Sequence, residues 1–411
     1  MSNEGFEHQN TKLIRVLACM MFFMFAMTTD AVGSIIPSLI DEFGLSLSAA
    51  SAFHYVPMVA IALGGLVLGF LSDRYGRKLT IVLGLLLYGI GSLLFILGNT
   101  FSFFVVLLGI SGIGVSVFKV GALALVGDIT RSTREHTTFM NTVEGFFAIG
   151  AIVGPALVAV LLTAGISWKY LYVSASAICA LLTVAALLVR YPSIQKTSEA
   201  QSSFSQTMVM MKNPYALGFS TLIMLYVAVE VAIYVWMPTW LEDYTSPTPW
   251  LATYALTIFF VLRAAGRFIG VWLLHLLSWD TVLAVMAAAI LLCFTGSLVA
   301  GPSLAVWLLP LSGLFMSVVY PTLNSKGISC FPKAEHGAIA GLILFFTAFA
   351  AALGPLAMAV VSDVLGDIRY GFILATGFAL LLCLGLLWNR IKAPAAARLV
   401  QYETAQALTT P

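Results

Sequence analysis

The stretch FFVVLLGISGIGVSVFKVGALALV, from Phe103 to Val126, is apolar or small at every position except Lys119. About twenty apolar residues span the hydrocarbon core of a bilayer, and a helix satisfies its own backbone groups there. An ionisable side chain is costly in such a segment and is by default a functional hypothesis. The stretch therefore predicts a membrane-spanning helix that carries a functional cation.

The rest of the chain is similarly rich in apolar residues and poor in charged ones. Of its residues, 60% are hydrophobic and 9% are charged, and the mean hydropathy is +1.00. These values exclude a water-soluble domain. We expect an all-α membrane protein with twelve transmembrane helices, over residues 14–38, 49–70, 79–98, 103–126, 139–163, 168–189, 215–240, 250–275, 281–300, 304–326, 337–361 and 370–390.

Basic residues set the orientation, because they are retained near the cytoplasmic ends of membrane helices. With the N-terminus inside, the external turns keep only Lys169 and Arg369. We expect both termini in the cytoplasm, in a bacterial inner membrane. The residues before Thr11 are short and polar and predict no cleaved signal peptide. The five cysteines are scattered, so neither a disulfide nor a metal site is expected.

The chain contains an internal repeat. The segment Ile36–Phe43 (IPSLIDEF) returns as Met237–Tyr244 (MPTWLEDY), 201 residues later. Three further matches recur at offsets of 200 or 201 residues: Gly65 and Gly69 with Gly266 and Gly270, Ser116–Lys119 with Ser317–Tyr320, and Gly154-Pro155 with Gly354-Pro355. We predict two parallel six-helix bundles, residues 1–190 and 214–392, with a cytoplasmic linker at 191–213 and a cytoplasmic tail at 393–411. Such repeats are typical of transporters that rock around a central solute site.

The segment GFLSDRYGRK, residues 69–78, resembles the loop between the second and third helices of the major facilitator superfamily. The resemblance extends over the whole chain and implies the major facilitator fold with alternating access. It also implies a cytoplasmic gate in which Asp73 faces the positive end of a helix dipole. The gate residues it points to are Gly69, Asp73, Arg74, Gly76 and Arg77, which Asp128 could join.

Within that superfamily, Tyr226–Trp236 (YVAVEVAIYVW) is similar to a segment of fucose, glucose and galactose symporters. Those symporters also carry an acid in the fourth helix, where this chain has Lys119 nearby. Asp30 lies seven residues before Pro37, where the pattern implies about four. These departures favour a substrate other than a neutral hexose.

Glu230 is the expected proton-coupling residue. Tyr226, Glu230 and Tyr234 are spaced by four and share one helix face, where an acid between two phenols can hold a proton or a solute. Low dielectric favours the neutral carboxyl, which can load a proton on one side and release it on the other. The alternative is a static salt bridge from Glu230 to Arg263 or Lys119.

Asp30 is nearly the repeat equivalent of Glu230 and is the second expected proton carrier, unless it pairs with Lys119. Lys119 itself either binds an anionic solute or exchanges partners with Asp30 as a switch. Arg263 has a planar fork that suits a carboxylate. Further expected solute contacts are Tyr226, Tyr234, Tyr320 and Asn324.

A second group of residues is expected to act in gating. A bridge between Glu144 and Arg267 would hold the inner side closed; the alternative is ordinary solvation of both side chains. Gly154 and Pro155, with their repeat partners Gly354 and Pro355, either bend both halves alike or permit close helix packing.

Together these features predict a proton-coupled secondary transporter, a symporter of a small polar or anionic solute such as a sugar or sugar acid. A proton-driven efflux pump for amphipathic compounds is the alternative, and a receptor on a transporter scaffold is a third. We expect no enzyme, because no nucleotide loop, metal cluster or nucleophile arrangement is present in the sequence. Expected partners are the substrate, protons and the lipid bilayer; we expect no cofactor or nucleic acid, and a monomer.

Overall fold

A computed structural model describes residues 3–68, 75–130, 133–191, 210–245, 247–332 and 335–400. Within these ranges, twelve helical segments are long and apolar enough to cross a membrane. They coincide with the twelve segments predicted from hydropathy. The prediction of an all-α membrane protein is confirmed.

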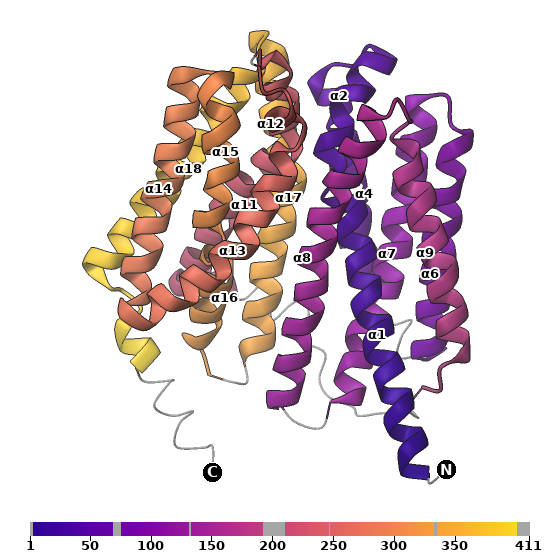
Figure 1. Cartoon of the computed structure of the whole chain (residues 1–411). Helices are drawn as coiled ribbons and strands as arrows, with labels where there is room; N and C mark the ends of the chain where they lie inside the picture. The colour runs from indigo at the N-terminus through magenta and orange to yellow at the C-terminus, as the bar shows by residue number, and fades with distance from the viewer. Residues whose placement is uncertain are drawn as a thin grey trace. The chain divides into compact units, whose positions relative to one another are not determined.

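The chain divides into two compact units, Met1–Thr197 and Ser198–Pro411. Most of the predicted linker, residues 192–209, lies outside the described residues. Figure 1 shows each unit as a bundle of long helices that lie side by side.

Unit 1 contains six membrane spans and their connections. Its elements are α1 (Asn3–Thr29), α2 (Val32–Phe43), α3 (Leu47–Ala50), α4 (Ala52–Leu68), α6 (Arg77–Leu94), η1 (Phe95–Leu97), α7 (Phe101–Ile129), α8 (Thr133–Thr163) and α9 (Lys169–Leu188). The main packed pairs are α1 with α8, α4 with α7, α6 with α7, α6 with α9 and α1 with α9. One end of the bundle is closed by stacked and edge-on rings of Phe53, Phe95, Phe104, Trp168 and Tyr172.

Unit 2 repeats this arrangement. Its elements are α11 (Pro214–Trp240), η2 (Leu241–Asp243), α12 (Trp250–Thr253), α13 (Ala255–Leu276), α14 (Trp279–Ala300), α15 (Pro302–Met316), α16 (Val319–Ser329), α17 (His336–Leu365) and α18 (Ile368–Lys392). The packed pairs are α11 with α17, α13 with α15, α14 with α15, α14 with α18 and α11 with α18. Each pair is the repeat equivalent of a pair in unit 1, which agrees with the predicted six-plus-six repeat.

Glycines set the closest helix contacts in both units. A Cβ built on Gly154 in α8 would lie 2.1 Å from the carbonyl oxygen of Met27 in α1. In unit 2, a Cβ on Gly354 in α17 would lie 3.4 Å from Cα of Ala228 in α11. Small residues let membrane helices approach closely. The same contact is therefore tight in unit 1 and ordinary in unit 2.

The first and the tenth spans are interrupted near their middles, which hydropathy alone does not predict. The first span breaks at Asp30 and Ala31, between α1 and α2. Just before this break, the hydroxyls of Thr28 and Thr29 donate to the carbonyl of Phe25, at 3.0 and 2.9 Å. Such back-bonding competes with the helix ladder and bends helices.

The tenth span breaks at Ser317 and Val318, between α15 and α16. Pro321 accounts for this break, because a proline has no N–H to donate and its ring crowds the carbonyl four residues earlier, here that of Ser317. Ser317 adds a side-chain bond from its hydroxyl to the Leu314 carbonyl, at 2.9 Å. Proline is tolerated in the first turn of α16, so the helix resumes at once.

Candidate functional site

Glu230 lies in the middle of α11 and is only 6% exposed. Its Oε1 atom forms an ion pair with Nη2 of Arg263 from α13. The same oxygen accepts a hydrogen bond from the hydroxyl of Tyr226, one turn earlier on α11, at 3.1 Å. The ion pair between Glu230 and Arg263, which the sequence left open as an alternative, is thus present. The Tyr226 hydroxyl bonds to the same carboxylate.

The Tyr226 hydroxyl has a second acceptor. It lies 2.9 Å from the carbonyl oxygen of Met316, the last residue of α15. Helix-terminal carbonyls have no intrahelical donor, so a side chain or water must satisfy them. Met316 was not predicted as part of the site; Pro321, whose ring crowds the carbonyl of the adjacent Ser317, is the sequence signal that could have located this helix end.

Other predicted solute contacts are distributed around this pair. The ring of Tyr320, on α16, lies 6.4 Å from that of Tyr226. Asn324 is half-buried one turn further along α16. The Tyr234 ring packs 6.2 Å from Phe260 of α13. The structure therefore brings Tyr226, Glu230, Arg263 and Tyr320 together, while Tyr234 lies two turns from Tyr226 and packs on Phe260.

In unit 1, Lys119 is half-buried on α7, and its ammonium lies over two aromatic rings of α1. The distances from Nζ to the ring centroids are 4.7 Å for Phe25 and 5.7 Å for Phe22. Cation–π attraction of this kind stabilises a charge at low dielectric. The carboxyl groups of Glu144 and Asp30 also lie near enough to interact electrostatically with the Lys119 ammonium. Lys119 thus lies among two aromatic rings and two acids, and its pairing with Asp30 stays a prediction.

Asp30 lies in the break between α1 and α2 rather than inside a helix. Its Oδ1 accepts a hydrogen bond of 3.3 Å from the Thr29 hydroxyl. A break of this kind exposes backbone groups that can bind ions or solutes in transporters.

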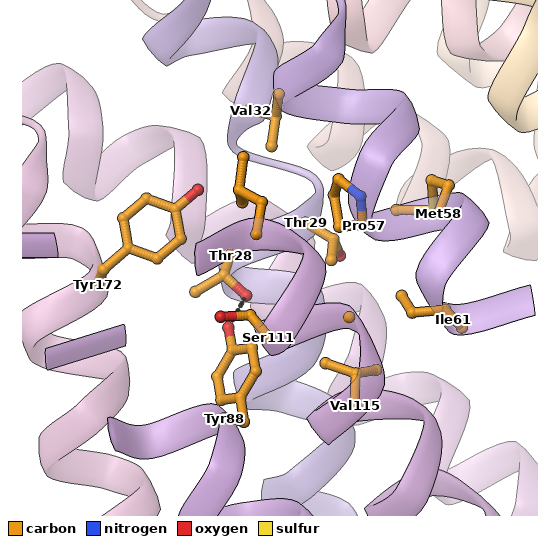
Figure 2. A pocket seen from close by; sticks show the side chains of 12 residues that line it. Thr28, Thr29, Val32, Pro57, Met58, Ile61, Tyr88, Ser111, Val115 and Tyr172 are labelled. Atoms are coloured by element: carbon orange, nitrogen blue, oxygen red, sulfur yellow. Dashed lines mark hydrogen bonds between the residues drawn. The ribbon is translucent and has the colours of Figure 1, made fainter. Parts of the chain in front are cut away.

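Beside this break, unit 1 contains a small cavity that the sequence did not predict (Figure 2). Its volume is about 20 Å³. Thr28, Tyr88, Ser111 and Tyr172 contribute hydroxyl groups to the lining, together with apolar side chains. The hydroxyls of Thr28 and Tyr88 lie 2.5 Å apart.

The predicted gate residues fall partly outside the described residues, which exclude Gly69, Asp73 and Arg74. Gly76 has φ +89° and precedes α6, whose first residue is Arg77. A positive φ suits glycine, which has no Cβ. Asp128 lies in the last turn of α7, and its side chain is not described.

The remaining gating predictions concern α8, α13 and α17. Pro155 and Pro355 lie inside α8 and α17, which both continue through them. The indole N–H of Trp236 donates to the Pro355 carbonyl at 3.0 Å and ties α11 to α17. Glu144 belongs to unit 1 and Arg267 to unit 2, so their bridge stays a prediction.

Comparisons with known proteins agree with this architecture. Residues 18–355 match the model of the Major Facilitator Superfamily. The chain is 25% identical over 365 residues to a glucose/galactose transporter of Brucella abortus biovar 1, covering 84% of this chain and 87% of the relative. It is 24% identical over 381 residues to multidrug resistance protein 2 of Bacillus subtilis, covering 89% and 93%.

The structure also resembles solved transporters. It superposes on the crystal structure of a D-xylose-proton symporter with a TM-score of 0.72, at 16% identity, covering 91% of this chain and 96% of the symporter. This likeness shows the shared fold. The family match extends through both units, and the relatives are membrane transporters rather than enzymes. The chain belongs to the Major Facilitator Superfamily, as an integral, multi-pass membrane transporter.

Proposed function

We propose that this protein is a proton-coupled symporter that moves a small polar or anionic solute by alternating access, with Glu230 as its proton-coupling residue. The observation that carries the proposal is the buried Glu230 carboxyl, held by Arg263 and Tyr226 within a membrane span. A buried carboxyl with one cationic partner has two low-energy forms. When the Glu230 carboxyl is ionised, it pairs with Arg263, and when it is protonated, it releases Arg263.

The release of Arg263 links the proton to the solute. A free guanidinium inside a membrane needs a new anionic partner, and a carboxylate fits its planar fork. The similarity to a glucose/galactose transporter favours a sugar-like solute, and Arg263 favours one that bears an acid group. Lys119 and Asp30 in unit 1 form a second charged group that could bind the solute or a proton.

The proposal also covers the orientation of the protein, its membrane and its oligomeric state. Because nearly all cationic loop residues lie on one side of the twelve spans, we place both termini in the cytoplasm, with the protein in a bacterial inner membrane. We propose that a monomer is sufficient, since each unit has its own packed core.

A proton-driven efflux pump is the second candidate. It is favoured by the similarity to a multidrug resistance protein over most of both chains. The same Glu230 site would then exchange a proton for an outgoing amphipathic compound. The direction in which the internal pH moves during solute transport separates the two functions.

The test uses the full-length protein in liposomes that contain a pH-sensitive dye. Sugars, sugar acids and amphipathic drugs are first screened by thermal stabilisation, because ligands that prefer the folded state raise its melting temperature. Acidification of the lumen with entry of a sugar or sugar acid supports the symporter. Alkalinisation with a drug supports the efflux pump.

Glu230→Gln then tests the residue. We expect this variant to exchange labelled solute across the membrane but to lose accumulation driven by a pH gradient. Glu42→Gln is the matched control. The Glu42 carboxylate also pairs with a cation, Lys169 at 3.8 Å, but its side chain is 41% exposed and lies near the end of a helix. If Glu230→Gln accumulates solute as the wild type does, Glu230 is not the coupling residue.

A further inference from the structure

The Tyr226 hydroxyl has one proton and faces two acceptors. Glu230 Oε1 lies at 3.1 Å and the Met316 carbonyl oxygen at 2.9 Å, and Tyr226 is 1% exposed. A single O–H group cannot donate a full hydrogen bond to both. Which acceptor receives the proton therefore depends on the state of Glu230.

The two protonation states of Glu230 give different hydrogen-bond patterns. The ionised carboxylate is an acceptor only, so it draws the Tyr226 proton and leaves the Met316 carbonyl weakly bonded. The protonated carboxyl has an O–H group that can donate to the Tyr226 oxygen. The Tyr226 proton is then free for the Met316 carbonyl. In this second pattern every polar group of the three has a partner.

The Met316 carbonyl is the end of α15, directly before the break at Ser317 and Val318. We propose that Tyr226 transmits the protonation state of Glu230 to this break, so that proton binding on α11 fixes the junction of α15 and α16. This inference rests on the proposed role of Glu230. It adds Tyr226 as a positioning residue and the junction of α15 and α16 as the element on which the proton acts.

Among the described residues of unit 2, few other groups near the pair could produce this response. From α13 the charged groups are Arg263, and Arg267 one turn further. The titratable groups of α16 are the phenol of Tyr320, beside Tyr226, and Lys326 in the last turn of the helix. The other packed helices meet α11 at small residues, α17 at Gly354 and α18 at Gly385. Helix α17 also accepts the hydrogen bond from the Trp236 indole at the Pro355 carbonyl, and neither of these two groups titrates.

Backbone hydrogen exchange at residues 316–322 of the reconstituted protein tests the inference. After correction for intrinsic exchange rates, we expect wild-type protection to rise as the pH falls, by roughly fivefold, the ratio that one net hydrogen bond supplies. Tyr226→Phe should abolish this pH dependence, because phenylalanine has no hydroxyl. Tyr244→Phe is the control, since the Tyr244 hydroxyl meets Thr248 in a loop.

A second variant covers the case in which Tyr226→Phe does not fold. Glu230→Gln presents an amide donor to the Tyr226 oxygen and should hold the junction in its protected state at every pH. Unchanged pH dependence in Tyr226→Phe, or an unprotected junction in Glu230→Gln, overturns the inference. If the wild type moves no protons with its solute, the proposed function fails instead, so the two failures are distinguishable.

The cavity in unit 1 carries an independent inference. Ser111 and Tyr172 are 3% and 2% exposed, and neither hydroxyl has a hydrogen-bond partner among the residues that the structure describes. Both line the cavity of about 20 Å³ beside the Thr28–Tyr88 pair (Figure 2). A water molecule needs about 10–15 Å³ and two to four polar partners. We infer that one ordered water occupies this cavity and bridges the two hydroxyls.

The sign of a stability change tests the bound water. In a dry cavity, Ser111→Ala and Tyr172→Phe each remove an unsatisfied hydroxyl, so the melting temperature should hold or rise. With a water in place, each variant should lower it, and the double variant should lose less than the sum. Ser220→Ala is the control, because Ser220 is fully buried and unpartnered in unit 2 and does not line this cavity. Melting temperatures that stay or rise in both variants overturn the inference.

Discussion

Gly154 and Gly354 are repeat partners, and the structure predicts opposite outcomes for the same substitution. An alanine Cβ at Gly154 would lie 2.1 Å from the Met27 carbonyl oxygen, about 0.9 Å inside the 3.0 Å that real contacts respect. Because a backbone carbonyl cannot rotate away, we expect a cost near the upper end for overpacking, about 3 kcal/mol. Alanine is the better helix former by about 1 kcal/mol. The net loss is about 2 kcal/mol, or roughly thirtyfold in the folding equilibrium.

Gly354→Ala is the matched control. Its Cβ would meet Ala228 at 3.4 Å, an ordinary contact, so only the helix-propensity gain remains, about 1 kcal/mol at most. Thermal unfolding with a thiol-reactive dye measures both variants, because all five cysteines are buried and free. We expect Gly154→Ala to melt below the wild type and Gly354→Ala at or above it. Equal shifts in the two variants, or a Gly154→Ala protein as stable as the wild type, would refute the close α1–α8 contact.

Three further predictions concern the charged residues. Arg263→Met should lower the free energy of unfolding by about 3 kcal/mol, because it leaves the buried Glu230 carboxylate without its cation. In the same melting assay, the double variant with Glu230→Gln should recover most of that loss, because the buried charge is then gone. If the solute is an anion, Lys119→Ala and Arg263→Ala should each raise the solute concentration for half-maximal uptake; unchanged values in both would exclude an anionic substrate. A Glu144–Arg267 bridge predicts that the two alanine variants are non-additive in a double-mutant cycle of the inward–outward equilibrium, and additivity would show that the bridge is absent.

The fold could be predicted because its signals are long and repeated. Twelve apolar segments and a register of about 201 residues specify two six-helix bundles, and the structure shows equivalent packed pairs in both. The face shared by Tyr226 and Glu230 could also be predicted, because helical spacing fixes it. The contact between Glu230 and Arg263 was one of two open pairings, the other being with Lys119, since nothing local to these residues specifies which helices pack together.

The setting of Lys119 could not be predicted for the same reason. Its rings, Phe22 and Phe25, belong to α1, nearly a hundred residues earlier in the chain. The sequence suggested Asp30 or an anionic solute as partner of Lys119, but it did not indicate the aromatic faces, which also stabilise a buried ammonium. Phenylalanine is common in membrane helices, so its presence at these positions carried no separate signal.

The helix breaks show how two similar repeats acquire different chemistry. Pro321 corresponds to Val120 in the first repeat. Because valine keeps its backbone N–H, α7 continues past the position that corresponds to the end of α15. Thr29 corresponds to Glu230, so the α11 helix has a carboxyl where α1 has a hydroxyl that bonds back to its own backbone. Single residues thus decide which helix is continuous and which exposes a carbonyl. In unit 2 the continuous helix carries the acid and the broken one supplies the acceptor, and that combination allows a proton on Glu230 to act on the junction of α15 and α16.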